Sequence, residues 1–417
     1  MSNLIIEICK KAKEASYKLA NVHTETKNRA LCNMAEALKK NVEVILEANR
    51  KDVEASRKKG IKQALIDRLV LDEKRIKKMA QCLQEVADSP DPVGEIVKIS
   101  TRPNGLIIGQ LRVPLGVVAV IYESRPDVTS DAVGICLKSG NAVILRGGSD
   151  AINSNMAIGK ILSDASVEAG IPEGAIQVVP VTDRATVLEL MKMRGYIDVL
   201  IPRGGADLIK AVIENAKVPV IETGTGNCHI YVEKDADLET AVKIIINAKC
   251  QRPGTCNAAE KLLVHREIAE TFLPKIIKAL RNHNVEVKGC EETRKIVPDV
   301  LPATEEDWYT EYLDLIIGVK VVDGIDEAIA HINKYGTKHS DAILTADFEK
   351  AIHFIRNVDS AAVYWNASTR FTDGYEFGLG AEIGISTQKI HARGPMSVQH
   401  LTTTKYFILG RDHVREL

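Results

Sequence analysis

Cys256 is the residue whose surroundings in this sequence best suit covalent chemistry. It stands in QRPGTCNAAEKLLV, after an Arg-Pro-Gly-Thr sequence that breaks a helix and before an apolar run typical of a strand. A cysteine reacts as its thiolate, and because a free thiol has a pKa of about 8.5, a nucleophilic cysteine needs an exposed, electropositive setting. Arg252 and the Asn257 backbone could supply that setting, whereas Cys250, in AVKIIINAKC, has the context of an ordinary buried cysteine. These residues alone leave open whether Cys256 reacts or packs.

Polar clusters follow three of the expected strands and could hold a ligand. They are Glu123-Ser124-Arg125-Pro126 after VVAVIY, Arg146-Gly147-Gly148-Ser149 after AVIL, and Arg203-Gly204-Gly205 after VLIP. In the last two, glycines let the backbone approach a ligand beside a positive side chain. Each cluster alone could be a solvated loop, but three at one sheet edge favour a phosphate-bearing ligand.

The segment ETGTGNCH contains Gly224 and Gly226, spaced as in the start of a dinucleotide-binding fingerprint. That fingerprint needs a third glycine and a helix directly afterwards. Here His229 stands in place of the glycine and a strand follows, so the segment favours a glycine-rich hinge between domains.

Length and composition indicate a soluble protein of two domains. The chain has 417 residues, of which 45% are hydrophobic and 27% charged. The net charge of -1 argues against a nucleic-acid-binding protein. No signal peptide or membrane-spanning run is evident, so we expect a cytoplasmic protein without membrane contact. The eight cysteines show no CxxC pair, so neither a metal site nor a disulfide framework is indicated.

The order of elements predicts an α/β fold. Residues 2–88 have helical periodicity in three stretches, and two β-branched runs within 95–113 flank Asn104-Gly105, a pair suited to a hairpin turn. Short apolar strands at 117–122, 142–147, 175–181, 198–202 and 218–223 then alternate with helices, which predicts a parallel, Rossmann-type sheet. A second set, HIYVEK, EKLLVH, LDLIIGVKVV, DAILTAD and AAVYWNA, begins after residue 228.

We therefore expect a nucleotide-binding domain at 1–227, with the hairpin of 95–113 protruding, and a catalytic α/β domain at 228–395. A C-terminal strand at 396–417 completes the chain. Hairpin and tail are candidates for a small β arm that joins subunits, although a sheet-edge hairpin is an equal alternative. The boundary between the domains falls at ETGTGNCHI, where ligand sites commonly form.

The sequence resembles the aldehyde dehydrogenase superfamily in the order of Glu222, Cys256 and Glu311, the last in EYLDLII. More closely, it is similar to the gamma-glutamyl phosphate reductases, also called glutamate-5-semialdehyde dehydrogenases, from about Ile5 to Gly410. The motifs that carry this resemblance are IYESRPDV, NAVILRGGSDA, IPRGGADLI, ETGTGNCHIYV, CNAAEKLLV, EYLDLIIGVKVV, NASTRFTDG and FGLGAEIGISTQKIHARGPM.

The resemblance implies NADPH-dependent reduction of L-glutamyl 5-phosphate to L-glutamate 5-semialdehyde and phosphate, the second step of proline biosynthesis from glutamate. Cys256 would be the nucleophile that forms a thioester, and its backbone N–H, next to Asn257, would stabilise the oxyanion. Hydrolytic relatives add an asparagine donor at a position matched here by Glu123-Ser124-Arg125, so Ser124 is the nearest candidate for the second donor.

The resemblance also implies the cofactor contacts. Arg146 replaces a lysine near the adenosine ribose and Ser149 replaces a carboxylate that grips the ribose hydroxyls, which favours NADP(H). Gly147, Arg203, Gly204 and Gly205 would lie nearby, and Glu311 would hold the nicotinamide ribose. Glu222 matches a water-activating base of hydrolytic relatives, but water would waste this intermediate, so it is grouped with the cofactor residues or interpreted as a hinge carboxylate.

The implied substrate carries a carboxylate and a phosphate, for which arginine side chains are the expected partners. Arg125, Arg252 and Arg370 are the candidates, with Arg393 also available and with Ser368 and Thr369 as hydroxyl donors. Two alternatives stay open: another aldehyde or CoA-acylating dehydrogenase, or a nucleotide-binding protein without turnover. We expect a homo-oligomer, either a dimer or a dimer of dimers, and glutamate 5-kinase as a candidate partner.

Overall fold

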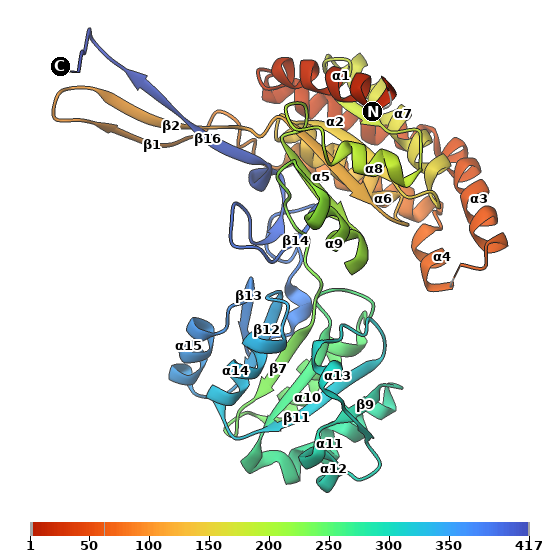
Figure 1. Cartoon of the computed structure of the whole chain (residues 1–417), viewed down its shortest axis with the longest axis vertical. Coiled ribbons are helices and arrows are strands. Elements are labelled where there is room, and N and C mark those ends of the chain that lie inside the picture. The colour runs from red at the N-terminus through yellow and green to blue at the C-terminus, as the bar shows by residue number, and fades with distance from the viewer. Residues whose placement is uncertain (1–2, 62, 416–417) are drawn as a thin grey trace. The chain divides into compact units, whose positions relative to one another are not determined.

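The chain divides into two compact units in the computed structural model, which describes residues 3–61 and 63–415 (Figure 1). Unit 1 comprises Met1–Thr223, Gly378–Gly384 and Met396–Leu417, and unit 2 comprises Gly224–Phe377 and Ile385–Pro395. The packing boundary thus lies a few residues before the expected one at 227. Residues 378–384, expected in the catalytic domain, pack with unit 1 because the chain crosses between the units more than once.

The first part of unit 1 is helical, as predicted. It forms α1 (Asn3–Leu19), α2 (Thr24–Lys40), α3 (Val42–Lys58), α4 (Gln63–Leu69) and α5 (Glu73–Asp88). Two of the three expected stretches are interrupted. Asn41 both ends α2 and begins α3, and Asp72 begins α5 by accepting a hydrogen bond from the Arg75 backbone N–H.

The sheet of unit 1 is parallel and has the strand order β5-β4-β3-β6. Its strands are β3 (Val117–Tyr122), β4 (Ala142–Gly147), β5 (Ile176–Val178) and β6 (Val199–Arg203), with helices α6 (Asp127–Lys138), α7 (Ile152–Glu168), α8 (Arg184–Leu190) and α9 (Ala206–Asn215) following them in turn. Every residue of β3 and β4 is buried, as expected for a sheet covered on both faces. The strand order reverses between β3 and β6, which is where such sheets bind ligands.

The prediction of a fifth strand at 218–223 was wrong. Val220 forms an isolated bridge to Leu200 of β6, where the Leu200 N–H donates to Pro219 O and the Ile221 N–H donates to Leu200 O. Pro219 has no N–H to continue a ladder, so the segment follows the sheet edge without becoming a strand.

The hairpin prediction was confirmed. Strands β1 (Ile96–Thr101) and β2 (Ile107–Pro114) pair antiparallel around a turn in which Gly105 has a φ of 86°. The C-terminal β16 (Thr402–Leu409) pairs antiparallel with β2, from Thr402 opposite Pro114 to Leu409 opposite Ile107. This three-stranded sheet projects away from the helices of unit 1 (Figure 1).

Unit 2 is built on a seven-stranded parallel sheet with the order β10-β9-β11-β8-β7-β12-β13. The strands are β7 (Cys228–Val232), β8 (Ala259–His265), β9 (Glu286–Gly289), β10 (Leu301–Pro302), β11 (Ile316–Val322), β12 (Ser340–Leu344) and β13 (Ala362–Trp365). Five of these were predicted, whereas the short edge strand β10 and its neighbour β9 were not.

The helices of unit 2 are α10 (Leu238–Cys250), α11 (Arg266–Asn282), α12 (Glu291–Ile296), α13 (Glu305–Tyr309), α14 (Ile325–Tyr335) and α15 (Phe348–Asn357). Short elements complete the chain: η1 (Thr369–Phe371), β14 (Gly384–Ser386), β15 (Gly394–Met396) and η2 (Val398–Leu401).

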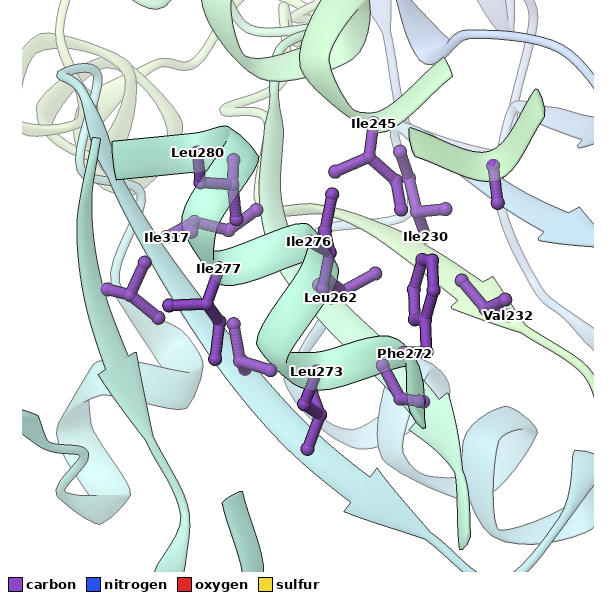
Figure 2. Packing of buried hydrophobic residues seen from close by; sticks show 14 of the residues in the cluster. Ile230, Val232, Ile245, Leu262, Phe272, Leu273, Ile276, Ile277, Leu280 and Ile317 are labelled. Carbon is purple, nitrogen blue, oxygen red and sulfur yellow. The ribbon is translucent and has the colours of Figure 1, made fainter. Parts of the chain in front are cut away.

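Helix α11 packs its apolar face onto this sheet (Figure 2). Phe272, Ile276 and Leu280 recur at helical spacing on that face, and each is fully buried. They meet Ile230 of β7, Leu262 of β8 and Ile317 of β11 in one continuous core. The strands are thereby fixed, and so are the segments that lead into them.

Candidate active site

Cys256 lies in a turn between α10 and β8, at the amino edge of the unit 2 sheet. The Ala258 N–H donates to Thr255 O at 3.0 Å, and the Cys256 side chain is half-buried. Cys250, expected to be buried, is also only half-buried because it ends its helix at the same edge. Exposure therefore does not distinguish the two thiols, and their surroundings must.

Two residues that precede or begin β7 support the Cys256 backbone. A Cβ atom at Gly226 would lie 1.4 Å from the Cys256 carbonyl oxygen, so only glycine fits at this position. The Cys228 thiol donates to the same oxygen at 3.1 Å. The sequence interpretation treated Gly226 as a hinge residue, and the structure adds a packing requirement.

Asn257 ties the cysteine turn to the segment around η1. Its Nδ2 donates to Thr372 O at 2.9 Å and to Arg370 O at 3.3 Å, and its Oδ1 accepts from the Arg370 guanidinium. The Thr369 hydroxyl donates to Asn257 O at 2.7 Å, and Ser368 Oγ accepts from the Arg370 backbone N–H at 3.3 Å. The predicted residues Asn257, Ser368, Thr369 and Arg370 are thus brought together.

Positive charge gathers beside the thiol. Burial lowers the pKa of Arg370, the positive charge of Arg252 lowers it further, and the Cys256 thiol opposes both effects. Arg370 Nε also donates to Gln251 Oε1 at 2.8 Å, which holds the guanidinium in place. Arg370 thus lies within electrostatic range of both the half-buried Cys256 and Arg252, and positive charge beside a cysteine favours its thiolate form.

Glu311, in the segment before β11, contacts Gly226, the glycine that lies against the Cys256 carbonyl. Its Oε1 accepts a hydrogen bond from the Gly226 N–H at 2.6 Å, and burial raises the pKa of its carboxyl group. Arg393, by contrast, donates to Asp359 Oδ1 at 2.9 Å and is engaged in that ion pair.

In unit 1, the predicted polar clusters follow the carboxyl ends of β3, β4 and β6. Ser124 adopts a φ of 44° after β3, and its hydroxyl donates to Asp150, between β4 and α7. Glu123 Oε2 accepts from the Gly205 N–H, at the start of α9, at 3.0 Å. The three clusters therefore meet at one edge, and Gly204 and Gly205 are exposed there together with Ser149.

Arg146 is buried rather than extended into solvent. Its Nη2 donates to Thr182 O at 2.6 Å and to Asp183 O at 3.3 Å, and burial lowers its pKa. Its Nε has no hydrogen-bond partner among the residues that the structure describes. A Cβ at the neighbouring Gly147 would collide with the Asn155 amide at 2.0 Å.

The predicted site residues thus divide between the two units, one group in each by position in the chain. The unit 1 group is Ser124, Arg125, Arg146, Gly147, Ser149, Arg203, Gly204, Gly205 and Glu222, of which Arg125 and Glu222 are half-buried. The unit 2 group is Arg252, Cys256, Asn257, Glu311, Ser368, Thr369 and Arg370.

Known proteins are similar in sequence to this chain over nearly its full length. The aldehyde dehydrogenase family model matches residues 2–298. The gamma-glutamyl phosphate reductase of Caldanaerobacter subterraneus is 63% identical over 98% of both chains, and that of Carboxydothermus hydrogenoformans is 61% identical over 99% of both. The chain belongs to the gamma-glutamyl phosphate reductase family. A crystal structure of the Thermotoga maritima member superposes with a TM-score of 0.97 at 55% identity, covering 99% of this chain and 100% of that one.

An acetylating aldehyde dehydrogenase from Geobacillus thermoglucosidasius, 20% identical with a TM-score of 0.71, shares the fold. The predicted aldehyde dehydrogenase-like fold and the predicted reductase family are both confirmed. Within the described residues, none of the helices combines the length and the apolar character that crossing a membrane would require.

Sequence reasoning missed several residues that contact this candidate site. Cys228 and Gln251 contact the cysteine turn and its arginine, but nothing in their local sequence indicates it. Glu260 and Lys261 did carry a signal, since two adjacent charges interrupt the apolar run AAEKLLV, and both are fully buried.

Proposed function

We propose that this chain reduces L-glutamyl 5-phosphate to L-glutamate 5-semialdehyde with NADPH, releasing phosphate, through a thioester on Cys256. The observation that carries the proposal is the half-buried Cys256 in electrostatic range of Arg370, which itself lies in electrostatic range of Arg252. It stands in a chain 63% identical to a relative named for this reaction. The reaction is the second step of proline biosynthesis from glutamate.

Cys256 Sγ, as the thiolate, attacks the acyl carbon of the substrate. The carbon–oxygen bond to phosphate then breaks, and phosphate leaves with the electron pair. Arg252 and Arg370 would bind the anionic groups of the substrate, helped by Arg125, and Ser368 and Thr369 hold the Arg370 segment in place. Each of these two hydroxyl groups already contacts the backbone, which supports a positioning role.

The negative charge that develops on the acyl oxygen needs donors. The Cys256 backbone N–H is one, and Asn257 fixes the turn that presents it. Ser124 remains the candidate for a second donor, and it would have to exchange the hydrogen bond that it makes to Asp150. Glu222 is not required as a base, because water would only hydrolyse the thioester.

The residues at the carboxyl edge of the unit 1 sheet fit a phosphorylated nucleotide. Arg146 has a buried Nε without a partner in the described part of the chain, and Gly147 lies where a side chain would not fit. NADPH, when bound, supplies the hydride that reduces the thioester. Arg146, Ser149, Arg203, Gly204 and Gly205 would hold its phosphate side, and Glu311 its nicotinamide ribose.

Arg146 beside an uncharged Ser149 favours the 2′-phosphate of NADP(H) over NAD(H), since a carboxylate at position 149 would repel it. We further propose a homo-oligomer formed through the three-stranded arm, with glutamate 5-kinase as a candidate partner. We also propose a cytoplasmic location, which is where charged biosynthetic substrates such as these are expected.

The test is a reverse assay of purified wild-type protein with glutamate semialdehyde, phosphate, and either NADP+ or NAD+. The proposal requires formation of NADPH that depends on phosphate and is faster than formation of NADH. Turnover that needs coenzyme A and ignores phosphate would indicate a CoA-acylating dehydrogenase. Absence of turnover together with measurable NADP+ binding would indicate a nucleotide-binding protein without catalysis.

A further inference from the structure

Unit 2 contains a buried ionic cluster that the proposed mechanism does not use, formed by Lys249 of α10 with Glu260 and Lys261 of β8. The side chains of all three are fully buried, and Lys249 Nζ lies 3.2 Å from Glu260 Oε1. Removing three charged groups from water is costly, and an apolar cluster of similar volume would often be as stable. Stability alone is therefore a weak explanation for these charges.

The remaining polar contacts of the cluster converge on one short segment, residues 310–313. Lys261 Nζ donates to Thr310 O at 2.7 Å. Glu260 accepts two backbone hydrogen bonds, from the Tyr312 N–H at 3.1 Å and from the Leu313 N–H at 3.4 Å. The cluster thus binds the backbone on both sides of Glu311.

The Thr310 N–H donates to Glu306 O of α13 at 3.1 Å, but residues 311–313 lie between α13 and β11 and belong to neither, so their backbone groups need other partners. Leu313 even adopts a φ of 55°, which a leucine rarely does without external support. Lys261 Nζ also lies 4.4 Å from the centre of the Tyr312 ring. This cation–π contact holds the Tyr312 side chain, which is next to Glu311 in the sequence. One buried donor and one buried acceptor are needed here, and aliphatic side chains supply neither.

Glu311 itself continues the chain of contacts to the nucleophile. Its carboxylate accepts from the Gly226 N–H, and Gly226 lies directly against the Cys256 carbonyl. A shift of residues 310–313 would therefore move the Glu311 carboxylate relative to the cysteine turn.

We propose that Lys249, Glu260 and Lys261 are positioning residues that hold Glu311 in place for the cofactor. The inference rests on the proposed function, since that function assigns Glu311 to the nicotinamide ribose. Burial raises the pKa of Glu260 to about 7 and lowers that of Lys261 to about 7, and the opposite charge of each partner opposes these shifts.

The experiment is a double-mutant cycle on the full-length protein, with Lys261→Met, Glu311→Gln and the combined variant. Lys27→Met is the matched control, because Lys27 is equally buried and ion-paired, with Asp91, but lies in unit 1. The readouts are the Kd for NADP+, the KM for NADP+ and kcat in the reverse assay, and the thermal melting temperature.

We expect each single variant to weaken NADP+ binding about tenfold, and the combined variant to be no weaker than Glu311→Gln alone. Lys27→Met should lower the melting temperature and leave NADP+ affinity unchanged. If Lys261→Met raised the Kd for NADP+ by the same factor in the wild-type and Glu311→Gln backgrounds, the proposal would be overturned. So would a loss of affinity in Lys27→Met as large as that in Lys261→Met.

If Lys261→Met does not fold, the near-isosteric Glu260→Gln takes its place in the same cycle. Wild-type protein without phosphate-dependent turnover would defeat the proposed function, and the NADP+ affinities of the four proteins would still decide the positioning role. Wild-type NADP+ affinity in Glu311→Gln would remove the role of Glu311, and with it this inference, while leaving the cysteine chemistry intact.

Discussion

Gly226 lies so close to Cys256 that a Cβ atom at position 226 would come within 1.4 Å of the Cys256 carbonyl oxygen. The Gly226 N–H meanwhile donates to Glu311 at 2.6 Å. Gly226 therefore contacts both Cys256, the expected nucleophile, and Glu311, a residue expected to bind the cofactor. It joins segments that are far apart in the sequence.

Gly226→Ala should lower kcat about a hundredfold, because the methyl group must displace the turn that carries Cys256 and misplaced reacting groups are costly. Steady-state kinetics in the reverse assay measures this. Gly324→Ala in the same unit is the control, since its Cβ would meet no atom closer than 4.0 Å. Comparable activity of the two variants would contradict the close contact.

Cys256→Ser should lower turnover by about a thousandfold or more while leaving NADP+ binding largely intact, because the hydroxyl is a far weaker nucleophile at neutral pH. The checks are turnover and the Kd for NADP+. Cys250→Ser, at a thiol of similar exposure, should retain activity. Normal turnover in Cys256→Ser would remove the covalent mechanism.

Arg370→Lys should raise the KM for glutamyl phosphate about tenfold, because lysine cannot reproduce the planar fork that contacts Gln251 and Asn257. Arg356→Lys, at an exposed position near the end of α15, is the control and should behave as wild type. The measurement is the initial rate as a function of substrate concentration. An unchanged KM would place the substrate anion elsewhere.

Asp359 should make unit 2 sensitive to acid. Hydrogen bonds from Lys389, and then from Arg393 and Lys338, hold its pKa well below the usual value, although burial opposes them. A lowered folded-state pKa gives stability that is present above the unfolded value, near 3.9, and is lost as pH falls through and below it.

The melting temperature of Asp359→Asn should thus lie below that of wild type at pH 7, and the difference should shrink as the pH falls to 3. Asp326→Asn, which removes a carboxylate that is 86% exposed, should show almost no difference at either pH. If the melting temperatures of Asp359→Asn and wild type differed by the same amount from pH 7 to pH 3, Asp359 would not be the source of the acid sensitivity.

The arm of β1, β2 and β16 should mediate subunit association. The arm exposes several large apolar side chains: Ile96, Val97 and Ile99 on β1, and Tyr406 and Ile408 on β16. Monomeric proteins seldom expose so many apolar side chains close together. Deleting 398–417, or substituting Tyr406→Lys with Ile408→Lys, should lower the mass measured by light scattering. Val414→Lys, beyond the strand, is the control, and an unchanged mass in the double variant would exclude this surface.

Much of the fold could be read from the sequence, because apolar periodicity is a local property. The strands from 117–122 to 198–202 and the hairpin around Asn104-Gly105 were predicted from their own residues and from their neighbours along the chain. The segment 218–223 was misread because its apolar run suits a strand, whereas its pairing depends on Pro219 and on the edge of β6.

The sequence by itself also determined the family and the residue expected to form the covalent bond, since the motifs around Cys256 and Arg370 retain their order and chemistry. Only the tertiary structure decided that Gly226 supports Cys256, and that Glu260 and Lys261 hold the backbone beside Glu311. These contacts join residues far apart along the chain, and their distances follow from how the strands of unit 2 are packed rather than from any local pattern.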